Sequence, residues 1–539
     1  MTPLAEGGVR SLVKRLDTVP SLLAVFRRLT QGGRRPHTVL LESAEPSSRQ
    51  TQKSLLVLSS ALEIICRGPS VMVRALNSNG RSVLPFLQQE LATFTPQLSR
   101  DELCLTVSKV IGLSDEQERL HAPSVLTVLR TIAQALTPET SDLPEAVFLA
   151  GVFAYDLVEQ FEPLPQPNSG DSFPDFLFYL ADQLLVIDHL AQRAFVVVNV
   201  FGGEFAGVNY HSAVQTVTAI SDAASEVKVE DPLPTIGSGA ADSLAAVHVD
   251  HSDAEFERTV QALQQHIVVG DVFQIVPSRT FSLPCADPFL SYESLRTLNP
   301  SPYLFYVNAG DFVLFGASPE SAVKVDGHSR QVEISPIAGT RPRGLHPDGS
   351  VDPDLDSRLE VELRLDTKEN AEHMMLVDLA RNDVARVSKP GTRFVAELLR
   401  VGRYSHVMHL VSRVCGELRD GLDALHAYQA SMNMGTLTGA PKICAMQLLR
   451  KYELGRRGPY GGAVGYLRGD GSFDTAIVIR SALVKDGVAR VRAGAGVVYD
   501  SVPALEADET RRKAEAVLRA IARANRQSAT PGAGSDHGR

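Results

Sequence analysis

Residues 462–493, GAVGYLRGDGSFDTAIVIRSALVKDGVARVRA, determine the class of fold. Three runs with the apolar and β-branched composition of strands, at 462–467, 473–484 and 488–493, are separated only by Gly469-Asp470-Gly471 and Asp486-Gly487. Such short loops join antiparallel strands, whereas parallel strands need a crossover of roughly a dozen residues or more. The stretch therefore predicts an antiparallel sheet and excludes a repeating βαβ fold.

Similar patterns continue on both sides of this stretch. Ser252-Asp253-Ala254-Glu255 has the form of a capping box, and the apolar residues behind it recur at the spacing of one helix face. Residues 122–136 have the same helical spacing. Further strands are predicted at 38–42, 71–76, 272–283, 303–307 and 312–317, and hairpins within 184–200 and 321–337, the second turning at Asp326-Gly327. This mixture indicates the α+β class.

The chain changes composition at one clear place. Residues 226–246 are polar and rich in Pro, Gly and Ala without any periodicity, which is typical of a linker. A length of 539 residues suggests roughly two to four domains. We therefore expect an N-terminal region at 1–225, a linker at 226–246, a second region at 247–525 and a disordered tail at 526–539.

Composition argues against several classes of partner. With 53 Lys+Arg against 63 Asp+Glu the formal net charge is -10, which does not suit a nucleic-acid partner. Five widely spaced cysteines without a Cys-x-x-Cys argue against a disulfide framework and a structural zinc site. No signal-peptide pattern opens the sequence, and no apolar run approaches the roughly 18 residues of a membrane span. We expect a cytoplasmic protein without a nucleic-acid or membrane partner.

Two pairs of glutamates are the first candidates for chemistry. Glu369 and Glu372, and again Glu506 and Glu509, stand three residues apart in segments predicted to be helical, so each pair projects from one helix face. If the two faces met, their oxygen ligands would suit Mg²⁺. The alternative is a solvated helix surface with local ion pairs, such as Glu509 with Lys513. Spacing alone does not separate the two.

Glycine-containing segments and two single residues are further candidates. Residues 435–442, GTLTGAPK, do not match a nucleotide-binding phosphate loop, but a helix N-terminus there could bind a carboxylate. Gly494-Ala495-Gly496 either allows a ligand close to the backbone or forms a bulge. His409 is a base candidate only if carboxylates and a pocket surround it. Arg480, placed in an apolar strand, needs an anionic partner, either internal or a ligand.

Eight short motifs follow the linker in this order: 270–279 (GDVFQIVPSR), 316–320 (GASPE), 336–341 (PIAGTR), 372–373 (EH), 378–383 (DLARND), 439–442 (GAPK), 460–462 (YGG) and 494–496 (GAG). In the N-terminal half, 40–44 (LLESA), 155–159 (YDLVE) and 174–175 (PD) add to them. Together they closely resemble the chorismate-utilising enzymes, and within that family the large subunits of anthranilate synthase. The resemblance implies large antiparallel and mixed sheets packed as a sandwich around an active-site cleft, with helices outside.

Two positions separate the reactions of this family. Isochorismate and salicylate synthases carry a lysine that activates water where this chain has Gln274, which fits ammonia as the nucleophile. Aminodeoxychorismate synthases typically have a lysine where this chain has Ala338. The resemblance thus implies that ammonia adds at C2 of chorismate and that pyruvate is then eliminated to give anthranilate, the first committed step of tryptophan biosynthesis. An aminodeoxychorismate synthase and a non-catalytic amino-acid sensor are the alternatives.

The resemblance also implies roles for individual residues. Mg²⁺ bound through Glu372 and Glu509, with Glu369 and Glu506 in support, would hold the ring carboxylate. Glu320 would protonate the departing C4 hydroxyl, and His409 would assist removal of the C2 proton. The remaining residues implied in catalysis or in substrate binding are Gln274, Gly339, Thr340, Tyr460, Arg480, Gly494, Ala495, Gly496 and Lys513. Among these, Tyr460 and Arg480 would bind the enolpyruvyl carboxylate.

A regulatory site and a partner follow from the same resemblance. Tryptophan would bind as feedback inhibitor at Ser43, Lys53, Pro302, Tyr303 and Leu304, although family members often have methionine at the last position. Ammonia would come from a glutamine amidotransferase small subunit, because none of the five cysteines lies in a Gly-x-Cys-x-Gly nucleophile turn. The expected assembly has two large and two small subunits.

Overall fold

Two long strands, β3 (Lys53–Arg67) and β9 (Phe176–Asp188), pair with each other and connect two layers of sheet. The computed structural model describes residues 4–43, 53–109, 115–140, 142–166, 173–227, 244, 246–346, 348, 350–404 and 407–529. The first half of β3 pairs with β2, and its second half pairs with β4. Likewise β9 pairs with β8 through one half and with β10 through the other. The layers therefore separate on either side of these two strands.

The first layer runs from the N-terminal half of the chain into the C-terminal half. In order of pairing its strands are β7 (Thr137–Pro138), β1 (Gly8–Arg15), β10 (Arg193–Phe201), β9, β3, β2 (Thr38–Glu42), β14 (Tyr303–Asn308), β15 (Val313–Ser318), β24 (Ser481–Lys485), β25 (Val488–Gly494), β13 (Ser278–Pro284) and β11 (His248–Val249). Only the β1–β7 pair is parallel, so this layer is mixed among the described strands.

The second layer likewise joins both halves. From β3 and β9 it extends through β4 (Ser70–Ala75), β6 (Glu102–Thr106) and β5 (Gln97–Leu98) on one side, and on the other through β8 (Phe148–Phe153), β22 (Ala463–Arg468), β23 (Phe473–Ile477), β16 (Ser321–Val325), β17 (Gln331–Ile334), β20 (Val407–Glu417), β19 (Phe394–Arg403) and β18 (Ile337–Pro342). A separate short pair is formed by β12 (Gln274–Ile275) and β21 (Gly439–Ala440).

Apolar side chains fill the space between the two layers. One core cluster joins Val39 and Phe305 of the first layer with Val152 and Val464 of the second. Such alternation of inward apolar residues on facing strands is what holds a sandwich together. The predicted α+β sandwich is confirmed.

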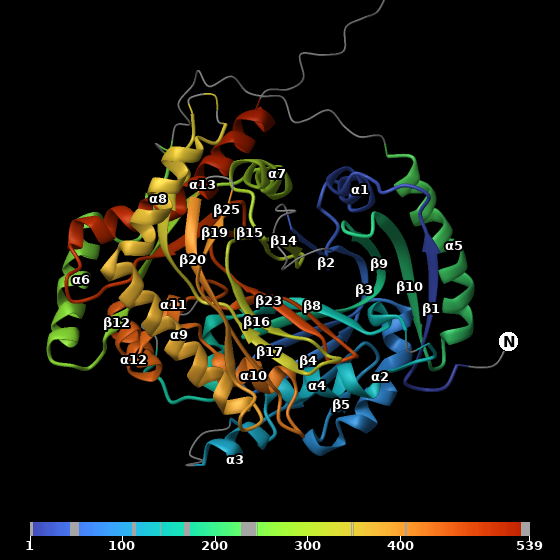
Figure 1. Cartoon of the computed structure of the whole chain (residues 1–539). Helices are drawn as coiled ribbons and strands as arrows, with labels where there is room; N and C mark the ends of the chain where they lie inside the picture. Colours follow the sequence, from blue (N-terminus) through green and yellow to red (C-terminus); the bar gives the residue numbers. More distant parts are fainter. Residues whose placement is uncertain are drawn as a thin grey trace, which may run out of the picture.

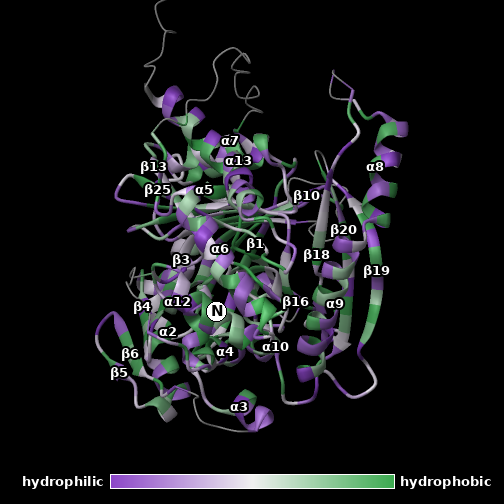
Figure 2. Cartoon of the chain, turned by 90° about the vertical axis from the view of Figure 1, so that its left-hand side faces the viewer, coloured by the Kyte–Doolittle hydropathy of each residue, from purple (hydrophilic) through white to green (hydrophobic). Residues whose placement is uncertain are grey.

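Helices cover the outer faces of both layers (Figure 1). Those packed outside the first layer are α1 (Leu22–Leu29), α5 (Ala206–Ser225), α7 (Pro288–Leu298) and α13 (Pro503–Ala529). Those outside the second are α2 (Ser78–Glu90), α3 (Glu116–His121), α4 (Val125–Ala135), α9 (Thr367–Val387) and α10 (Ala424–Ser431). Figure 2 shows α8 (Pro353–Leu365) with β18, β19 and β20 along one side of the molecule.

The remaining helices lie between or beside these elements. The helices α6 (Asp253–Val268), α11 (Gly435–Thr438) and α12 (Lys442–Tyr452) surround the β12–β21 pair, and single 3₁₀ turns occur at Ala92–Phe94, Pro144–Ala146 and Tyr155–Gln160. No helix in the described part of the chain has the length and apolar character needed to cross a bilayer.

Local signals in the sequence are mostly confirmed. Ser252 caps α6 with the reciprocal Ser252–Glu255 bonds of a capping box, and the hairpins at Asp326-Gly327 and Asp486-Gly487 form as predicted. Two predicted continuous strands are wrong. The stretch 272–283 divides into β12 and β13 around Val276-Pro277, because proline has no N–H to donate to a ladder.

The second strand break matters more for function. The stretch 473–484 divides into β23, which pairs with β22, and β24, which pairs with β25. Arg480 stands at the break with φ of 50°, a left-handed conformation that is rare for a residue with a side chain and concentrates at functional sites. The prediction that Arg480 lies in a strand is therefore wrong.

The predicted N-terminal and second regions share the same two sheet layers. The pairings β2–β14 and β8–β22 connect strands from before and after residues 226–246 into the same layers. Most of the predicted linker, residues 228–243 and 245, lies outside the described residues. Helix α13 continues to Ala529, so the predicted tail is wrong for residues 526–529, and 530–539 lie outside the described part. The chosen boundaries otherwise remain predictions.

Candidate active site

Acidic side chains from α9 and α13 face each other. The pKa of Glu372 is raised by burial and by the negative charges of Glu369 and Glu509, so the carboxylates of the two helices are close enough to repel one another. Gln274 Nε2 donates to Glu372 Oε1 at 2.9 Å. Lys513 Nζ lies 2.6 Å from Glu509 Oε1. The predicted convergence of two acidic helix faces is thus present in the structure.

Local contacts fix the direction of the α9 glutamates. Asp366 caps α9 by accepting from the Glu369 backbone N–H at 3.0 Å. Arg341 Nη2 binds Asp366 at 2.7 Å, and its Nη1 binds Glu369 Oε1 at 3.2 Å. Arg341 belongs to the 336–341 motif, but sequence alone gave it no role because its partners are more than twenty residues away.

The buried amide of Gln274 has one free end. Its side chain is 2% exposed, and Oε1 has no hydrogen-bond partner in the described chain. Because a carboxylate only accepts hydrogen bonds, Glu372 orients the amide N–H₂ toward itself and leaves Oε1 as an acceptor. A Cβ on Gly496 would lie 2.9 Å from Gln274 Nε2, so a larger residue there would displace this amide. The site therefore offers a small molecule one unpaired acceptor.

Glu320 is a carboxyl held protonated. It follows β15 at the turn into β16 and is 8% exposed. Burial raises its pKa to about 8, although the Thr436 hydroxyl, the Lys513 charge and the Ile337 backbone oppose the rise. Ile477 N donates to the Glu320 backbone carbonyl at 3.0 Å. A carboxylic acid with such a pKa donates a proton readily near neutral pH.

This raised pKa makes the stability of the chain depend on pH. Glu320 holds its proton more tightly when folded than when unfolded, so its contribution to folding declines as the pH rises from about 4.5 to about 8 and is constant above. We expect the midpoint of thermal unfolding of Glu320→Gln to rise relative to the unaltered chain across this interval. Scanning calorimetry of both proteins at several pH values measures the difference. A difference that does not change with pH would contradict the buried, protonated state.

His409 of β20 is oriented by β18. Its Nδ1 lies 2.9 Å from the Gly339 carbonyl oxygen and 3.1 Å from Thr340 Oγ1. Because a carbonyl only accepts, Nδ1 carries the proton and Nε2 is left unprotonated as an acceptor. Burial and the Arg480 charge lower the pKa of His409, which keeps the ring neutral near pH 7.

Arg480 and Tyr460 provide donors for an anion. Burial lowers the pKa of Arg480, while Tyr460 and Glu509 raise it, so these groups lie together. Neither the guanidinium nor the Tyr460 hydroxyl has a hydrogen-bond partner among the described residues. Beneath Tyr460, Arg457 stacks at 5.8 Å from the ring centroid and binds the buried Glu453 at 2.7 Å. A half-buried arginine whose guanidinium has no partner among the described residues fits a carboxylate ligand.

The remaining predicted substrate residues close this side of the site. Lys513 Nζ donates to the Gly494 carbonyl at 3.0 Å, so its charge is shared between that carbonyl and Glu509. A Cβ on Gly494 would lie 2.9 Å from the Tyr460 hydroxyl. Ala495 is fully buried. The structure thus brings Gln274, Glu320, Glu372, Tyr460, Arg480 and Lys513 into one region, together with Gly339, Thr340, His409, Gly494, Ala495, Gly496, Glu369, Glu506 and Glu509.

A cavity of about 420 Å³ lies elsewhere, between the two layers. Lys53, Tyr303 and Leu304 of the predicted inhibitor site line it, and Ser43 and Pro302 adjoin its lining residues in sequence. The buried Ser43 hydroxyl has no hydrogen-bond partner in the described chain. Sequence analysis missed five polar residues of its wall. Lys324, Tyr466 and Asp474 reach the cavity through the pairing of β16, β22 and β23, and Asp326 and Arg468 stand at the ends of β16 and β22.

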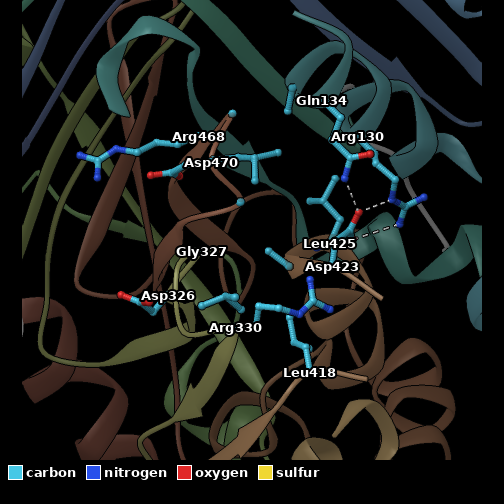
Figure 3. Close-up of a pocket in the computed structure, with 16 residues that line it drawn as sticks. Arg130, Gln134, Asp326, Gly327, Arg330, Leu418, Asp423, Leu425, Arg468 and Asp470 are labelled. Carbon is cyan, nitrogen blue, oxygen red and sulfur yellow. Dashed lines mark hydrogen bonds and ion pairs between the residues drawn. The ribbon is translucent and has the colours of Figure 1, made fainter. Parts of the chain in front are cut away.

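A second pocket, of about 210 Å³, contains none of the predicted residues. Figure 3 shows Arg130 and Gln134 directed at Asp423, and Arg330 reaching the same side of the pocket, where it donates to the Leu422 carbonyl at 2.9 Å. Arg130 Nε and Asp423 are 2.5 Å apart, so their charges satisfy each other. We assign no chemistry to this pocket.

Known proteins share this chain's sequence and fold. A family model described as chorismate binding enzyme matches residues 90–519. The chain belongs to the chorismate binding enzyme family. The acidic residues of α9 and α13, Glu320 and the Tyr460–Arg480 pair all lie within the matched residues.

Several curated members of the family are similar over most of their length. "Anthranilate synthase component 1" of Vibrio cholerae is 53% identical over 505 residues, covering 92% of this chain and 93% of that protein. The Escherichia coli protein of the same name is 50% identical, with 94% and 96% covered. Anthranilate synthase component I of Streptococcus pneumoniae superposes with a TM-score of 0.62 at 29% identity, covering 88% and 94%. The menaquinone-specific isochorismate synthase of E. coli, at 18% identity and a TM-score of 0.65, shares the fold and covers 97% of this chain and 96% of its own.

Proposed function

We propose that this chain is the large component of an anthranilate synthase, which converts chorismate and ammonia to anthranilate and pyruvate. The observation that carries the proposal is Glu320, a buried carboxyl with a pKa of about 8 beside Lys513 of the acidic site. Chorismate must lose a hydroxyl, and such a carboxyl supplies the proton that lets it leave as water. The curated relatives at 50% and 53% identity support the same reaction.

Ammonia adds at C2, the ring double bonds shift, and the C4–O bond breaks as Glu320 protonates the departing oxygen. His409 Nε2, the unprotonated nitrogen of a neutral ring, then takes the C2 proton as the enolpyruvyl group leaves to become pyruvate. Gln274 Oε1, the unpaired acceptor, would bind an N–H of the incoming ammonia. Its amide cannot act as a base, which favours ammonia over water as the nucleophile. Arg480 and Tyr460 would hold the enolpyruvyl carboxylate.

A divalent cation fits the acidic site. Among the described residues, no three His, Cys, Asp or Glu side chains form a metal-binding group by themselves. Glu372 and Glu509 supply two oxygen donors, and their mutual repulsion favours a cation between them. The ring carboxylate of chorismate would be the further ligand, with Glu369 and Glu506 in support. When bound, Mg²⁺ would supply Lewis-acid stabilisation of the developing negative charge.

The partner would be a glutamine amidotransferase small subunit, in an assembly of two large and two small subunits. Glutamine hydrolysis of this kind needs a thiolate nucleophile. Cys66, Cys285 and Cys415 are buried, and burial raises the pKa of each thiol. The exposed Cys104 and the half-buried Cys444 do not lie in a Gly-x-Cys-x-Gly turn, so the five cysteines together support a source of ammonia outside the chain. The proposed place of action is the cytoplasm.

The direct test supplies purified chain with chorismate and Mg²⁺, and with either ammonium or glutamine. We expect anthranilate and pyruvate in equal amounts with ammonium and neither with glutamine. An amino product formed without pyruvate would identify an aminodeoxychorismate synthase. No conversion of chorismate with ammonium would favour a non-catalytic sensor. Turnover with glutamine by the single chain would contradict the need for a partner.

The cavity between the layers is the proposed tryptophan site. Asp474 lies 3.3 Å from Lys324 Nζ and 3.3 Å from the Tyr303 hydroxyl, and Lys53 adds a further positive charge to the wall. Glu42 is held by Arg296 at 3.0 Å, so its charge is already satisfied. Charges of both signs beside apolar walls suit an aromatic amino acid.

Replacing Lys53 with methionine is expected to weaken tryptophan binding by about tenfold while leaving ammonium-dependent turnover within about twofold, since one charge contact with the head group is lost. The chain contains no tryptophan, so fluorescence of the ligand itself reports binding without a protein background. Arg15→Met, on the distant strand β1, serves as the matched control. Equal tryptophan affinity of Lys53→Met and the unaltered chain would contradict the assignment.

A further inference from the structure

Arg279 is the most completely buried arginine in the described chain and has no role in the chemistry above. It stands in β13 with 1% exposure. Its guanidinium lies 5.1 Å from the ring centroid of Phe256 and 5.2 Å from that of Phe281. A fully buried guanidinium is retained only where its donors are used.

The Arg279 guanidinium donates hydrogen bonds to one turn of α13. Arg279 Nε donates to Thr510 Oγ1 at 2.8 Å, and Nη2 donates to the Ala507 carbonyl at 2.8 Å. Thr510 Oγ1 in turn donates to the Ala507 carbonyl at 2.7 Å. Ala507 and Thr510 each follow one of the acidic residues, Glu506 and Glu509. The planar fork of arginine therefore fixes the rotation of the turn that carries both carboxylates.

The backbone of Arg279 lies in a strand that adjoins the candidate active site. In the β13–β25 pair Arg279 is opposite Ala493, and Ser278 is opposite Gly494. Gln274 precedes Arg279 by five residues. The guanidinium thus ties the helix of Glu509 to the strand that adjoins the 494–496 backbone.

Charge is not what Arg279 contributes to the acidic cluster. Its Nη2 lies 2.8 Å from Asp253 Oδ1, which neutralises it. The groups that shift the pKa of Glu506, in addition to burial, are Ser501, Glu509, Lys368 and Lys513, and those acting on Glu372 likewise exclude Arg279. The contribution is geometric.

We propose that Arg279 is a positioning residue for the divalent-cation site: through Thr510 and Ala507 it sets the rotation of α13 so that Glu509 faces Glu372. The proposal rests on the proposed function, because it assumes that Glu509 is a ligand of the cation. A ligand carboxylate that is free to turn binds a cation more weakly, since binding must then order it.

Two substitutions of Thr510 test the proposal without touching the acidic residues. Thr510→Val removes the hydroxyl at nearly constant volume, and Thr510→Ser retains it. Binding of Mg²⁺ is measured by titration calorimetry with saturating chorismate and without ammonium, so that no turnover occurs. We expect the dissociation constant for Mg²⁺ to rise about tenfold in Thr510→Val and to stay within about twofold in Thr510→Ser. Arg279→Lys, which keeps the charge beside Asp253 but loses the fork, should match Thr510→Val.

Asp253→Asn is the comparison, because it removes the ion pairs that Asp253 makes with Arg279 and with the exposed Arg511 of α13 but leaves the Arg279 contacts to Thr510 and Ala507 in place. Its Mg²⁺ affinity should equal that of the unaltered chain. If Thr510→Val lowers the midpoint of thermal unfolding but binds Mg²⁺ as tightly as the unaltered chain, Arg279 is only structural and the proposal is overturned. If the unaltered chain with chorismate binds no Mg²⁺, the metal role of Glu509 fails and this proposal fails with it.

Discussion

Replacing Glu320 with glutamine is expected to lower kcat for ammonium-dependent anthranilate formation by about 10³, within the range assigned to general acids. The amide keeps the size of the side chain and its place at the turn, but it cannot give a proton to the departing hydroxyl. KM for chorismate should change little, since the substitution removes a contribution made in the transition state. Anthranilate fluorescence measures the rate.

Glu293→Gln is the control for this experiment. Glu293 is also buried, at 3% exposure, but it lies on α7 and pairs with Arg27 at 2.6 Å. The Glu293→Gln variant should retain nearly full anthranilate-forming activity even if its thermal stability is lower. An activity of Glu320→Gln within about tenfold of the unaltered chain would exclude Glu320 as the acid, because one such factor equals only about 1.4 kcal/mol.

The second large effect concerns the acidic pair. Glu372→Gln is expected to reduce kcat/KM for chorismate by about 10³ or more, because a Lewis acid contributes several kcal/mol to the transition state and each 1.4 kcal/mol is about tenfold. It should also abolish the Mg²⁺ binding seen by calorimetry with chorismate. The measurement is a titration of both quantities against Mg²⁺.

Glu397→Gln is the comparison for Glu372→Gln. Glu397 lies on β19 and pairs with Arg400 at 3.1 Å and Arg413 at 3.3 Å, away from the cluster. It should leave the Mg²⁺ dependence unchanged. Retained turnover and retained Mg²⁺ binding in Glu372→Gln would remove Glu372 from the metal site.

Features that depend on neighbours in sequence were predictable. The Ser252 cap of α6 and the turns at Asp326-Gly327 and Asp486-Gly487 are set within a few residues, and each formed as expected. The position of Arg480 was not predictable. Its apolar neighbours read as one continuous strand, whereas the break arises because β23 and β24 pair with different layers.

The candidate site also contains features that the sequence predicts and features that depend on distant packing. The i,i+3 spacing predicted that each glutamate pair shares a helix face, but only the packing of α9 and α13 brings Glu372 near Glu509. Arg279 and Arg341 escaped notice because their partners are distant in sequence. Both arginines end motifs that the sequence displays, at 270–279 and 336–341, but a motif shows neither burial nor distant partners. The walls of the larger cavity, including Asp474, depend on strand register, which composition does not specify.

The position of a bound divalent cation tests the proposed active site most directly. A crystal of the chain soaked with Mn²⁺ and chorismate, without ammonium, locates the ion by its anomalous scattering. We predict one strong peak between the carboxylates of Glu372 and Glu509, in contact with the ring carboxylate. A chorismate-bound structure with no ion there, or with the ion at other residues, would contradict the account.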